Sequence, residues 1–114
     1  MYNFMKFTLQ NAKQFGWEGI KGFEYSNKDD FANASIAYAE VDGGHGKIKN
    51  IKSDRVYIIT DGEGEFIINE EVVLVKKTDA VIIPKNMPYD YRGKMKIFLI
   101  DLPAFTPDAD VKVS

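Results

Sequence analysis

The chain lacks cysteine and has a single histidine among its 114 residues. The absence of cysteine excludes disulfide bonds, thiol catalysis and thiolate metal sites. The one histidine, His45, cannot form a metal site by itself, and the nearby carboxylates are not arranged with clear ligand spacing. Ser-His-Asp catalysis cannot be argued from one histidine either.

Long apolar runs and long basic blocks are also missing. The N-terminal stretch "MYNFMKFTLQNAKQFGWEG" has no apolar run long enough for a signal peptide or a membrane span. Lys and Arg number 15 against 17 Asp and Glu, so the formal net charge is -2. Sequence-independent nucleic-acid binding depends on neutralising phosphates, which this balance does not favour. We therefore expect a soluble, cytoplasmic protein that binds neither nucleic acid nor membranes.

What the chain does contain is enough apolar material for one packed core. Hydrophobic residues make up 45% and aromatic residues 13% of the sequence, and its length suits one domain. The apolar runs are short and β-branched: "ASIAYAEV", "RVYIIT", "EFIIN", "VVLV", "AVIIP" and "KIFLID". Turn signals such as "DGGHG", "TDGEGE" and "PKNMPYD" separate them. This pattern predicts an antiparallel sandwich or barrel with little helix.

The expected organisation has three parts within that one domain. Residues 1–34 form an N-terminal edge segment that packs on the barrel, with a turn of helix followed by edge strands. Residues 35–105 form the barrel itself, and residues 106–114 form a C-terminal tail. Runs such as "VYII" and "VVLV" do not alternate apolar and polar residues, so both faces of these strands are apolar. Because a small domain has little surface with which to cover a second apolar face, we expect a homodimer.

Two sets of residues are spaced as in the motifs of a known family. The first set is Gly43, Lys49, Ile51, Arg55 and Gly62. The second is Thr78, Pro84, Asn86, Tyr89 and Gly93. At these spacings the sequence resembles a small single-domain cupin over residues 35–105. The resemblance implies an all-β fold, a cupin-type antiparallel jelly-roll β-barrel with little helix.

The resemblance extends to the scaffold but not to the metal ligands. The positions of the four ligands of the family correspond to Lys49, Ile51, Arg55 and Tyr89. Lysine and arginine have no free lone pair near neutral pH, isoleucine coordinates nothing, and tyrosine binds a metal only as a phenolate. We therefore expect no metal and no cofactor in this protein.

The same positions predict a different kind of pocket. Side chains alternate along a strand, so Lys49, Ile51, Arg55 and Tyr57 are expected on one face, which points into the barrel if the register of the family holds. Tyrosines of a later strand are expected to point inward as well. The predicted ligand-binding residues are Lys49, Arg55, Tyr57, Tyr89 and Tyr91.

Arg55 and His45 leave alternatives open. A buried arginine is usually paired, so Arg55 either forms an internal ion pair, with Glu40, Glu63 or Asp101 as candidates, or binds an anionic group of a ligand. His45 has the pKa of a general base, but it lies in the turn "GGHG", out of register with the ligand positions. The sequence therefore assigns no catalytic residue.

Three functions are compatible with these residues. The first is a metal-independent cupin-fold protein that binds a small polar or anionic molecule; sugars and sugar phosphates enter only through the family resemblance. The second is a metal-independent isomerase or epimerase of nucleotide sugars with Tyr89 or Tyr91 as the acid, but its base is missing. The third is a degenerate structural or regulatory dimer module with a filled barrel.

Overall fold

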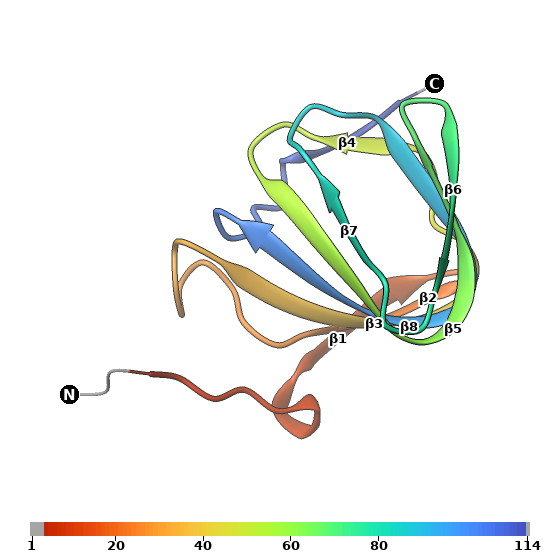
Figure 1. The fold of residues 1–114 in the computed structure, drawn as a ribbon. Coiled ribbons are helices and arrows are strands. Elements are labelled where there is room, and N and C mark those ends of the chain that lie inside the picture. Colours follow the sequence, from red (N-terminus) through yellow and green to blue (C-terminus); the bar gives the residue numbers. More distant parts are fainter. Residues whose placement is uncertain (1–3, 114) are drawn as a thin grey trace.

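The computed structural model describes residues 4–113, and nearly all of the regular structure in them is β-strand. A single turn of 3-10 helix, η1 (Leu9–Asn11), precedes the strands (Figure 1). The strands are β1 (Lys13–Trp17), β2 (Ile20–Glu24), β3 (Ser35–Gly44), β4 (Ile48–Asn50), β5 (Asp54–Ile68), β6 (Glu71–Lys76), β7 (Ala80–Ile83), β8 (Tyr89–Leu102) and β9 (Asp110–Lys112). The all-β prediction with little helix is confirmed. No helix in this part of the chain is long or apolar enough to cross a membrane.

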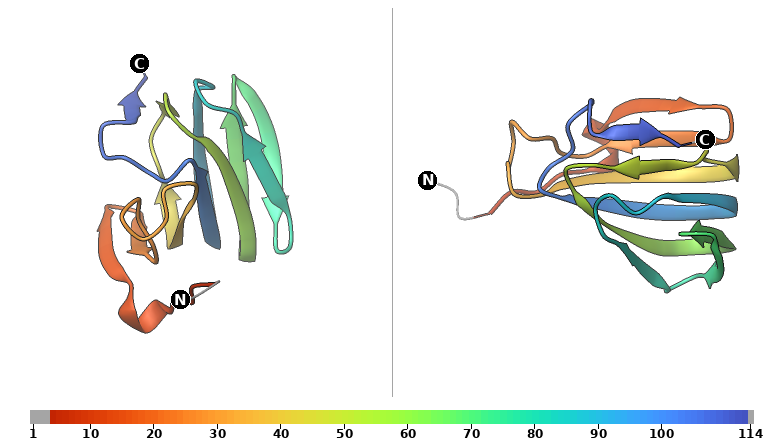
Figure 2. Two further views of the ribbon diagram at one scale, coloured as in Figure 1. Left: turned by 90° about the vertical axis from the view of Figure 1, so that its left-hand side faces the viewer. Right: turned by 90° about the horizontal axis from the view of Figure 1, so that it is seen from above.

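The strands form one antiparallel sheet that curls into a cupin-like β-barrel (Figures 1 and 2). One path of neighbours runs β1-β2-β3-β8-β4-β9, and β5 pairs with β8, β6 and β7. The long strands β5 and β8 pair along almost their whole length, with a bulge between Ile59 and Asp61. The N-terminal strands β1 and β2 extend the sheet of their own barrel beyond β3.

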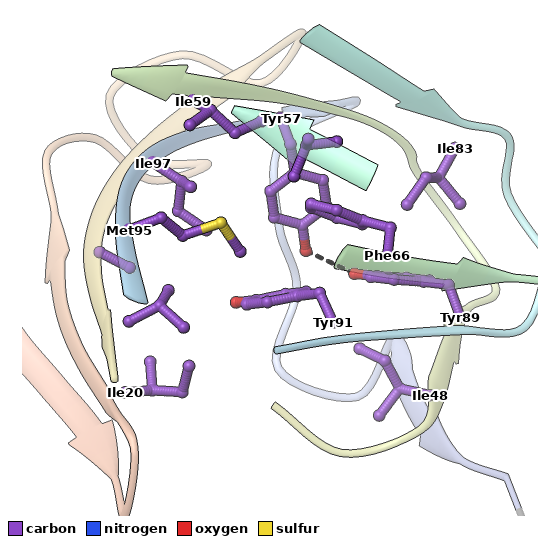
Figure 3. Packing of buried hydrophobic residues seen from close by; sticks show 13 residues of the cluster. Ile20, Ile48, Tyr57, Ile59, Phe66, Ile83, Tyr89, Tyr91, Met95 and Ile97 are labelled. Atoms are coloured by element: carbon purple, nitrogen blue, oxygen red, sulfur yellow. Dashed lines mark hydrogen bonds between the residues drawn. The ribbon is translucent and has the colours of Figure 1, made fainter. Parts of the chain in front are cut away.

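Alternation along β5 and β8 builds the interior. Arg55, Tyr57 and Ile59 are buried, whereas Ile58 between them is 37% exposed. On the paired strand β8, Tyr91 and Ile97 face the same interior (Figure 3). The cluster of buried apolar side chains consists of Ile20, Ala39, Val41, Ile48, Tyr57, Ile59, Phe66, Val75, Ile83, Tyr89, Tyr91, Met95 and Ile97.

The outer face of the same strands is apolar too. Ile82 on β7 is 69% exposed, Leu102 on β8 is 41% exposed, and Ile58 on β5 lies on the same face. Both faces of the strands are thus apolar, as the sequence pattern predicts. The homodimer inferred from this pattern stays a prediction.

Candidate functional site

An internal cavity of about 410 Å³ lies on the concave side of the sheet, lined by residues of β1, β2, β3, β5 and β8. His45, Phe105 and Asp110 complete its wall from the connecting segments and β9. Its volume falls in the range of small-molecule sites, and its wall is mostly apolar and aromatic with a few polar groups. The barrel is therefore not filled by its own side chains.

Three of the five predicted ligand-binding residues line this cavity: Arg55, Tyr57 and Tyr91. Tyr89 is 1% exposed and lies behind them, with its hydroxyl bonded to both Arg55 and Tyr57.

The expected orientation of Lys49 is wrong, and so is that of Ile51. On β4 the side chains of Ile48 and Asn50 are buried, which turns Lys49 to the opposite face, and Ile51 is 41% exposed. A bend at residues 51–52 separates β4 from β5. It is held by the Asn50 side chain, which accepts hydrogen bonds from the backbone N–H groups of Lys52 (2.9 Å) and Ser53 (2.6 Å). The two-residue alternation of side chains along β5 does not extend back from Arg55 to Ile51 and Lys49, because this bend interrupts the strand.

Arg55 forms the internal ion pair that was one of its two predicted roles. Its Nε lies 2.8 Å from Oδ1 of Asp101, one of the predicted partners. Asp110, which was not predicted, lies 2.9 Å from Nη1 and accepts a hydrogen bond from Nη2 at 3.1 Å. Nη2 also donates to Asp101 at 3.3 Å, and Nη1 donates to the Tyr89 hydroxyl at 2.8 Å. With five N–H donors in a guanidinium group, little capacity is left for a ligand anion.

The charges of this cluster explain its protonation. Burial alone would lower the pKa of Arg55, but the neighbouring tyrosines and Asp101 outweigh it, and the pKa is raised. Burial raises the pKa of Asp101, and Arg55 opposes this shift. One cation therefore faces two carboxyl groups, Asp101 and Asp110, at this end of the cavity. An additional anion gains little there.

A chain of hydrogen bonds runs from Arg55 through Tyr89 to Tyr57 (Figure 3 draws its last bond). Since Arg55 only donates, the oxygen of Tyr89 accepts, and its proton is free to be donated to the Tyr57 oxygen 2.6 Å away. In that arrangement the Tyr57 proton has no acceptor among the described residues. Burial raises the pKa of both Tyr57 and Tyr89, so both phenols hold their protons near neutral pH.

Tyr91 presents a second phenol to the cavity. Its hydroxyl has no hydrogen-bond partner within residues 4–113, although the residue is only 3% exposed. In Figure 3 this hydroxyl points away from the Tyr57–Tyr89 pair, toward the side where Ile20 lies. Burial raises the pKa of Tyr91 as well, so this phenol holds its proton near neutral pH.

His45, to which the sequence assigned no role because it is out of register with the family's ligand positions, lines the cavity. Its backbone N–H donates to the carbonyl of Tyr91 at 2.8 Å, and its ring lies 4.7 Å from the Tyr91 ring and 5.2 Å from that of Trp17. Gly46 follows at φ +104°, a conformation that favours glycine, and its N–H donates to Asp90. The turn thus folds the imidazole back over the cavity, which it lines.

The tautomer of His45 follows from its contacts. Nδ1 lies 2.8 Å from the carbonyl oxygen of Gly46, which only accepts, so Nδ1 carries the proton. Nε2 then holds a lone pair and has no hydrogen-bond partner in the described part of the chain. Burial lowers the pKa of His45, assisted by Arg55 and opposed by the hydrogen bond to Gly46. A neutral imidazole and two phenols together supply one base and two acids.

The described side chains around the cavity are not arranged as a set of metal ligands. Within residues 4–113 no three His, Cys, Asp or Glu side chains are grouped so that they could hold a metal ion. Of the carboxylates that line the cavity, Asp101 and Asp110 are already bonded to Arg55, and Glu24 accepts a hydrogen bond from Asn27.

Comparison with known proteins gives fold neighbours only. No protein-family profile and no curated protein matches the chain. Streptomyces Pac13 in a histidine-to-glutamine variant with uridine superposes with a TM-score of 0.87 and 28% identity, covering 96% of this chain and 90% of that one. A tyrosine-to-phenylalanine variant with uridine gives a TM-score of 0.88 at 27% identity, covering 98% and 92%. Pac13 is described as a nucleoside dehydratase.

A more distant neighbour is KdgF from Halomonas sp., with a TM-score of 0.78 and 12% identity over 90% of this chain and 96% of that one. At this identity the likeness concerns the fold alone. The structural neighbours are cupin-like, which supports the resemblance to the cupin superfamily that the sequence motifs indicate.

Proposed function

We propose that this protein is a metal-independent dehydratase of a small, uncharged, hydroxyl-bearing molecule of the nucleoside class. The observation that carries the proposal is the neutral imidazole of His45, which lines the cavity together with the protonated phenols of Tyr57 and Tyr91. This combination supplies the base whose absence weighed against an enzyme at the sequence level.

The structural neighbours support this class of substrate. Pac13 is described as a nucleoside dehydratase, and uridine is present in variants that replace one histidine or one of two tyrosines. The two replaced tyrosines are separated by the same number of residues as Tyr57 and Tyr91. The replaced histidine precedes the first tyrosine by one residue more than His45 precedes Tyr57.

The proposed reaction is an elimination of water. Nε2 of His45 removes a proton from a substrate carbon, the electron pair of that C–H bond forms a C=C bond, and the C–O bond to the neighbouring hydroxyl breaks. The phenol of Tyr91, which is otherwise unpaired, donates its proton to the departing oxygen, so that water leaves. An imidazole base needs a C–H bond that an adjacent carbonyl makes acidic. The substrate is therefore a carbonyl-containing nucleoside rather than uridine itself.

Arg55 and Tyr89 are positioning residues in this scheme. Arg55 donates to the oxygen of Tyr89, which leaves the Tyr89 proton for the Tyr57 oxygen and the Tyr57 proton for the ligand. Because Arg55 is also bonded to Asp101 and Asp110, it does not serve as an anion-binding site. We infer that the substrate is uncharged rather than phosphorylated, which narrows the earlier expectation of a small polar or anionic molecule.

The other two functions fit less well. A degenerate module would have a filled barrel, whereas a cavity of about 410 Å³ is present. Epimerisation uses the same base, but it needs an acid that returns a proton to carbon. The unpaired Tyr91 phenol is better matched to an oxygen leaving group, because phenols exchange protons with oxygen readily.

The test combines binding with turnover. Calorimetry measures uridine binding, and mass spectrometry follows loss of water from uridine derivatives oxidised to a carbonyl on the sugar. We expect the wild type to bind uridine and dehydrate such a derivative. His45→Gln should keep its uridine affinity within about threefold and lose about 10²–10⁴-fold in rate.

Lys85→Gln, a change at an exposed residue outside the cavity, is the matched control and should keep both properties. Dehydration that survives in His45→Gln at the wild-type rate contradicts the assignment of the base. Absence of binding for uridine and for all oxidised derivatives contradicts the proposed substrate class.

A further inference from the structure

The inner face of the β1–β2 hairpin forms the mouth of the cavity and carries groups that the proposed reaction does not use. Antiparallel pairing places Lys13 opposite Glu24, Phe15 opposite Gly22 and Trp17 opposite Ile20. Lys13, Phe15, Trp17 and Glu24 all line the cavity.

Two aromatic side chains form a shelf at this mouth. Phe15 is 41% exposed and Trp17 is 50% exposed, with ring centroids 6.4 Å apart. The Phe15 ring lies directly over Gly22, where a Cβ would stand 2.3 Å from the ring, so glycine is the residue that permits this close approach. Exposed aromatic rings beside a cavity suit a planar ligand group, because stacking a base on an aromatic side chain stabilises a complex by about 1–3 kcal/mol.

A polar edge adjoins the shelf. Lys13 and Glu24 face each other across the hairpin. Among the described residues, these two form no ion pair with each other. Oε1 of Glu24 accepts a hydrogen bond from Nδ2 of Asn27 at 3.1 Å, and Asn27 also lines the cavity. A carboxylate acceptor therefore lies next to an ammonium donor and an amide donor.

We propose that this hairpin face is a base-recognition subsite for a uracil-type ring, which stacks on Phe15 while its edge is read by Glu24 and Lys13. The proposal rests on the proposed function and names its substrate class more closely. The imide edge of uracil presents an N–H donor between two carbonyl acceptors. Glu24 can accept from that N–H, and Lys13 can donate to a neighbouring carbonyl.

The same arrangement disfavours cytosine. The corresponding ring nitrogen of cytosine is an acceptor, which would face the Glu24 carboxylate with no proton between them. A site built around a hydrogen bond rejects the analogue that cannot form it, because its own polar group is left unpaired.

The subsite also orients the ligand relative to the reacting groups. Trp17 connects the two regions, since its ring lies 6.4 Å from Phe15 and 5.2 Å from His45, and its Nε1 donates to the carbonyl of His45 at 3.3 Å. A base held at the mouth places the sugar deeper in the cavity, toward His45 and Tyr91. This is the end at which the proposed elimination takes place.

The experiment uses the single tryptophan of the chain as its probe. Trp17 fluorescence is titrated with uridine, cytidine and ribose, and calorimetry repeats the titrations for wild type, Glu24→Gln, Phe15→Leu and Phe15→Ala. The wild type should bind uridine at least 10-fold more tightly than cytidine and should bind ribose weakly. Glu24→Gln should lose most of this preference, and Phe15→Ala should lose about 5–100-fold in affinity for both nucleosides.

Glu71→Gln, an exposed carboxylate on β6, is the matched control and should behave as the wild type. Phe15→Leu keeps an apolar side chain on Gly22, so it separates loss of stacking from loss of folding, which circular dichroism monitors. Equal wild-type affinity for uridine and cytidine, or unchanged affinity in Glu24→Gln and both Phe15 variants, overturns the subsite but leaves the dehydratase proposal intact. Failure of both nucleosides to bind overturns the subsite and the proposed substrate class together.

Discussion

The phenol oxygens of Tyr57 and Tyr89 lie 2.6 Å apart inside the barrel, at the end of a hydrogen-bond chain that begins at Arg55. Two hydroxyl groups at this distance share one proton between them, and the donor is decided by what else each oxygen touches. Because Arg55 donates to Tyr89, Tyr89 can donate its own proton to Tyr57 and leave the Tyr57 proton for the cavity, which Tyr57 lines. The buried Arg55 is thus connected to the cavity through two phenols.

Replacing Tyr89 by phenylalanine should break this chain. Arg55 Nη1 loses one of its two acceptors and Tyr57 loses its neighbour, so we expect a loss of about 1–3 kcal/mol in the free energy of unfolding, measured by urea denaturation. Tyr25→Phe is the control, because the Tyr25 hydroxyl has no hydrogen-bond partner within residues 4–113. It should stay within about 0.5 kcal/mol of the wild type. Equal stability of the two variants would mean that the chain contributes nothing.

The protonation of His45 gives a prediction about pH. Burial lowers its pKa below the ordinary value of 6.5, so the folded protein should protonate His45 only at more acidic pH than an unfolded chain does. Since His45 is the only histidine, its ring protons can be followed by NMR without assignment ambiguity. We expect a midpoint below 6.5.

The same shift has a consequence for stability, with a defined sign. Below pH 6.5 the unfolded state binds more protons at this position than the folded state does, so stability is complete above 6.5 and decreases as the pH falls toward the folded pKa. His45→Gln should remove this part of the pH dependence. A His45 midpoint at or above 6.5 would contradict the half-buried, neutral imidazole on which the base assignment depends.

The strand pattern and the scaffold residues of the fold were readable from the sequence. Asn86, which stands where the cupin motif has glycine, has φ +70°, in agreement with the tolerance of asparagine for this conformation. Arg55, Tyr57 and Ile59 face the interior, because uninterrupted strands obey an alternation of two. The alternation rule predicted side-chain orientation correctly where the residues lie on the same uninterrupted strand.

The site was only partly readable because it depends on chain reversals. The bend after Asn50 reverses the alternation and sends Lys49 outward. The turn at Gly46 brings His45 to Tyr91, a residue 46 positions away, through a backbone hydrogen bond. Likewise Asp110 reaches Arg55 only because β9 pairs with β4. No periodicity in the sequence encodes these contacts, although a titratable histidine in a glycine-rich turn beside a binding strand is a signal worth following.

Removal of divalent metals should leave the protein unaffected. The described residues offer no group of three metal-binding side chains, and the proposed elimination uses only imidazole and phenol groups. We expect that treatment with a chelator changes neither the uridine affinity nor the rate of dehydration, and that elemental analysis finds no stoichiometric metal. Activity that is lost on chelation and restored by one metal ion would contradict metal independence.

The exposed apolar face of β5, β7 and β8 should bind a second copy of the chain. Ile82 on β7 is 69% exposed, and Ile58 on the neighbouring strand β5 and Leu102 on β8 are also partly exposed on this face. Light scattering coupled to size-exclusion chromatography should give twice the mass of one chain. Ile82→Asp should convert the dimer to a monomer, because an unpaired carboxylate would be buried in the interface. Lys77→Asp, at an exposed position, changes the charge in the same direction and should stay dimeric.

The ion pair of Arg55 with Asp101 either stabilises the barrel or only directs hydrogen bonds, and two variants distinguish these roles. Both side chains are almost fully buried, and removing one partner of such a pair leaves the other charge without compensation. Arg55→Met should therefore lower the free energy of unfolding by about 3–5 kcal/mol, measured by urea denaturation. The double variant Arg55→Met, Asp101→Leu removes both charges and should recover a large part of this loss, because an apolar pair of similar volume packs without desolvating an ion.

Uridine binding by the double variant distinguishes a stabilising role of the ion pair from a role in directing protons. If the pair mainly directs the Tyr89 and Tyr57 protons, the double variant should fold well and still lose affinity for uridine. The Asp110 carboxylate is then left without its partner, so Asp110→Asn in the same background should add further stability. A double variant that is as stable as the wild type and binds uridine equally well would show that Arg55 positions nothing.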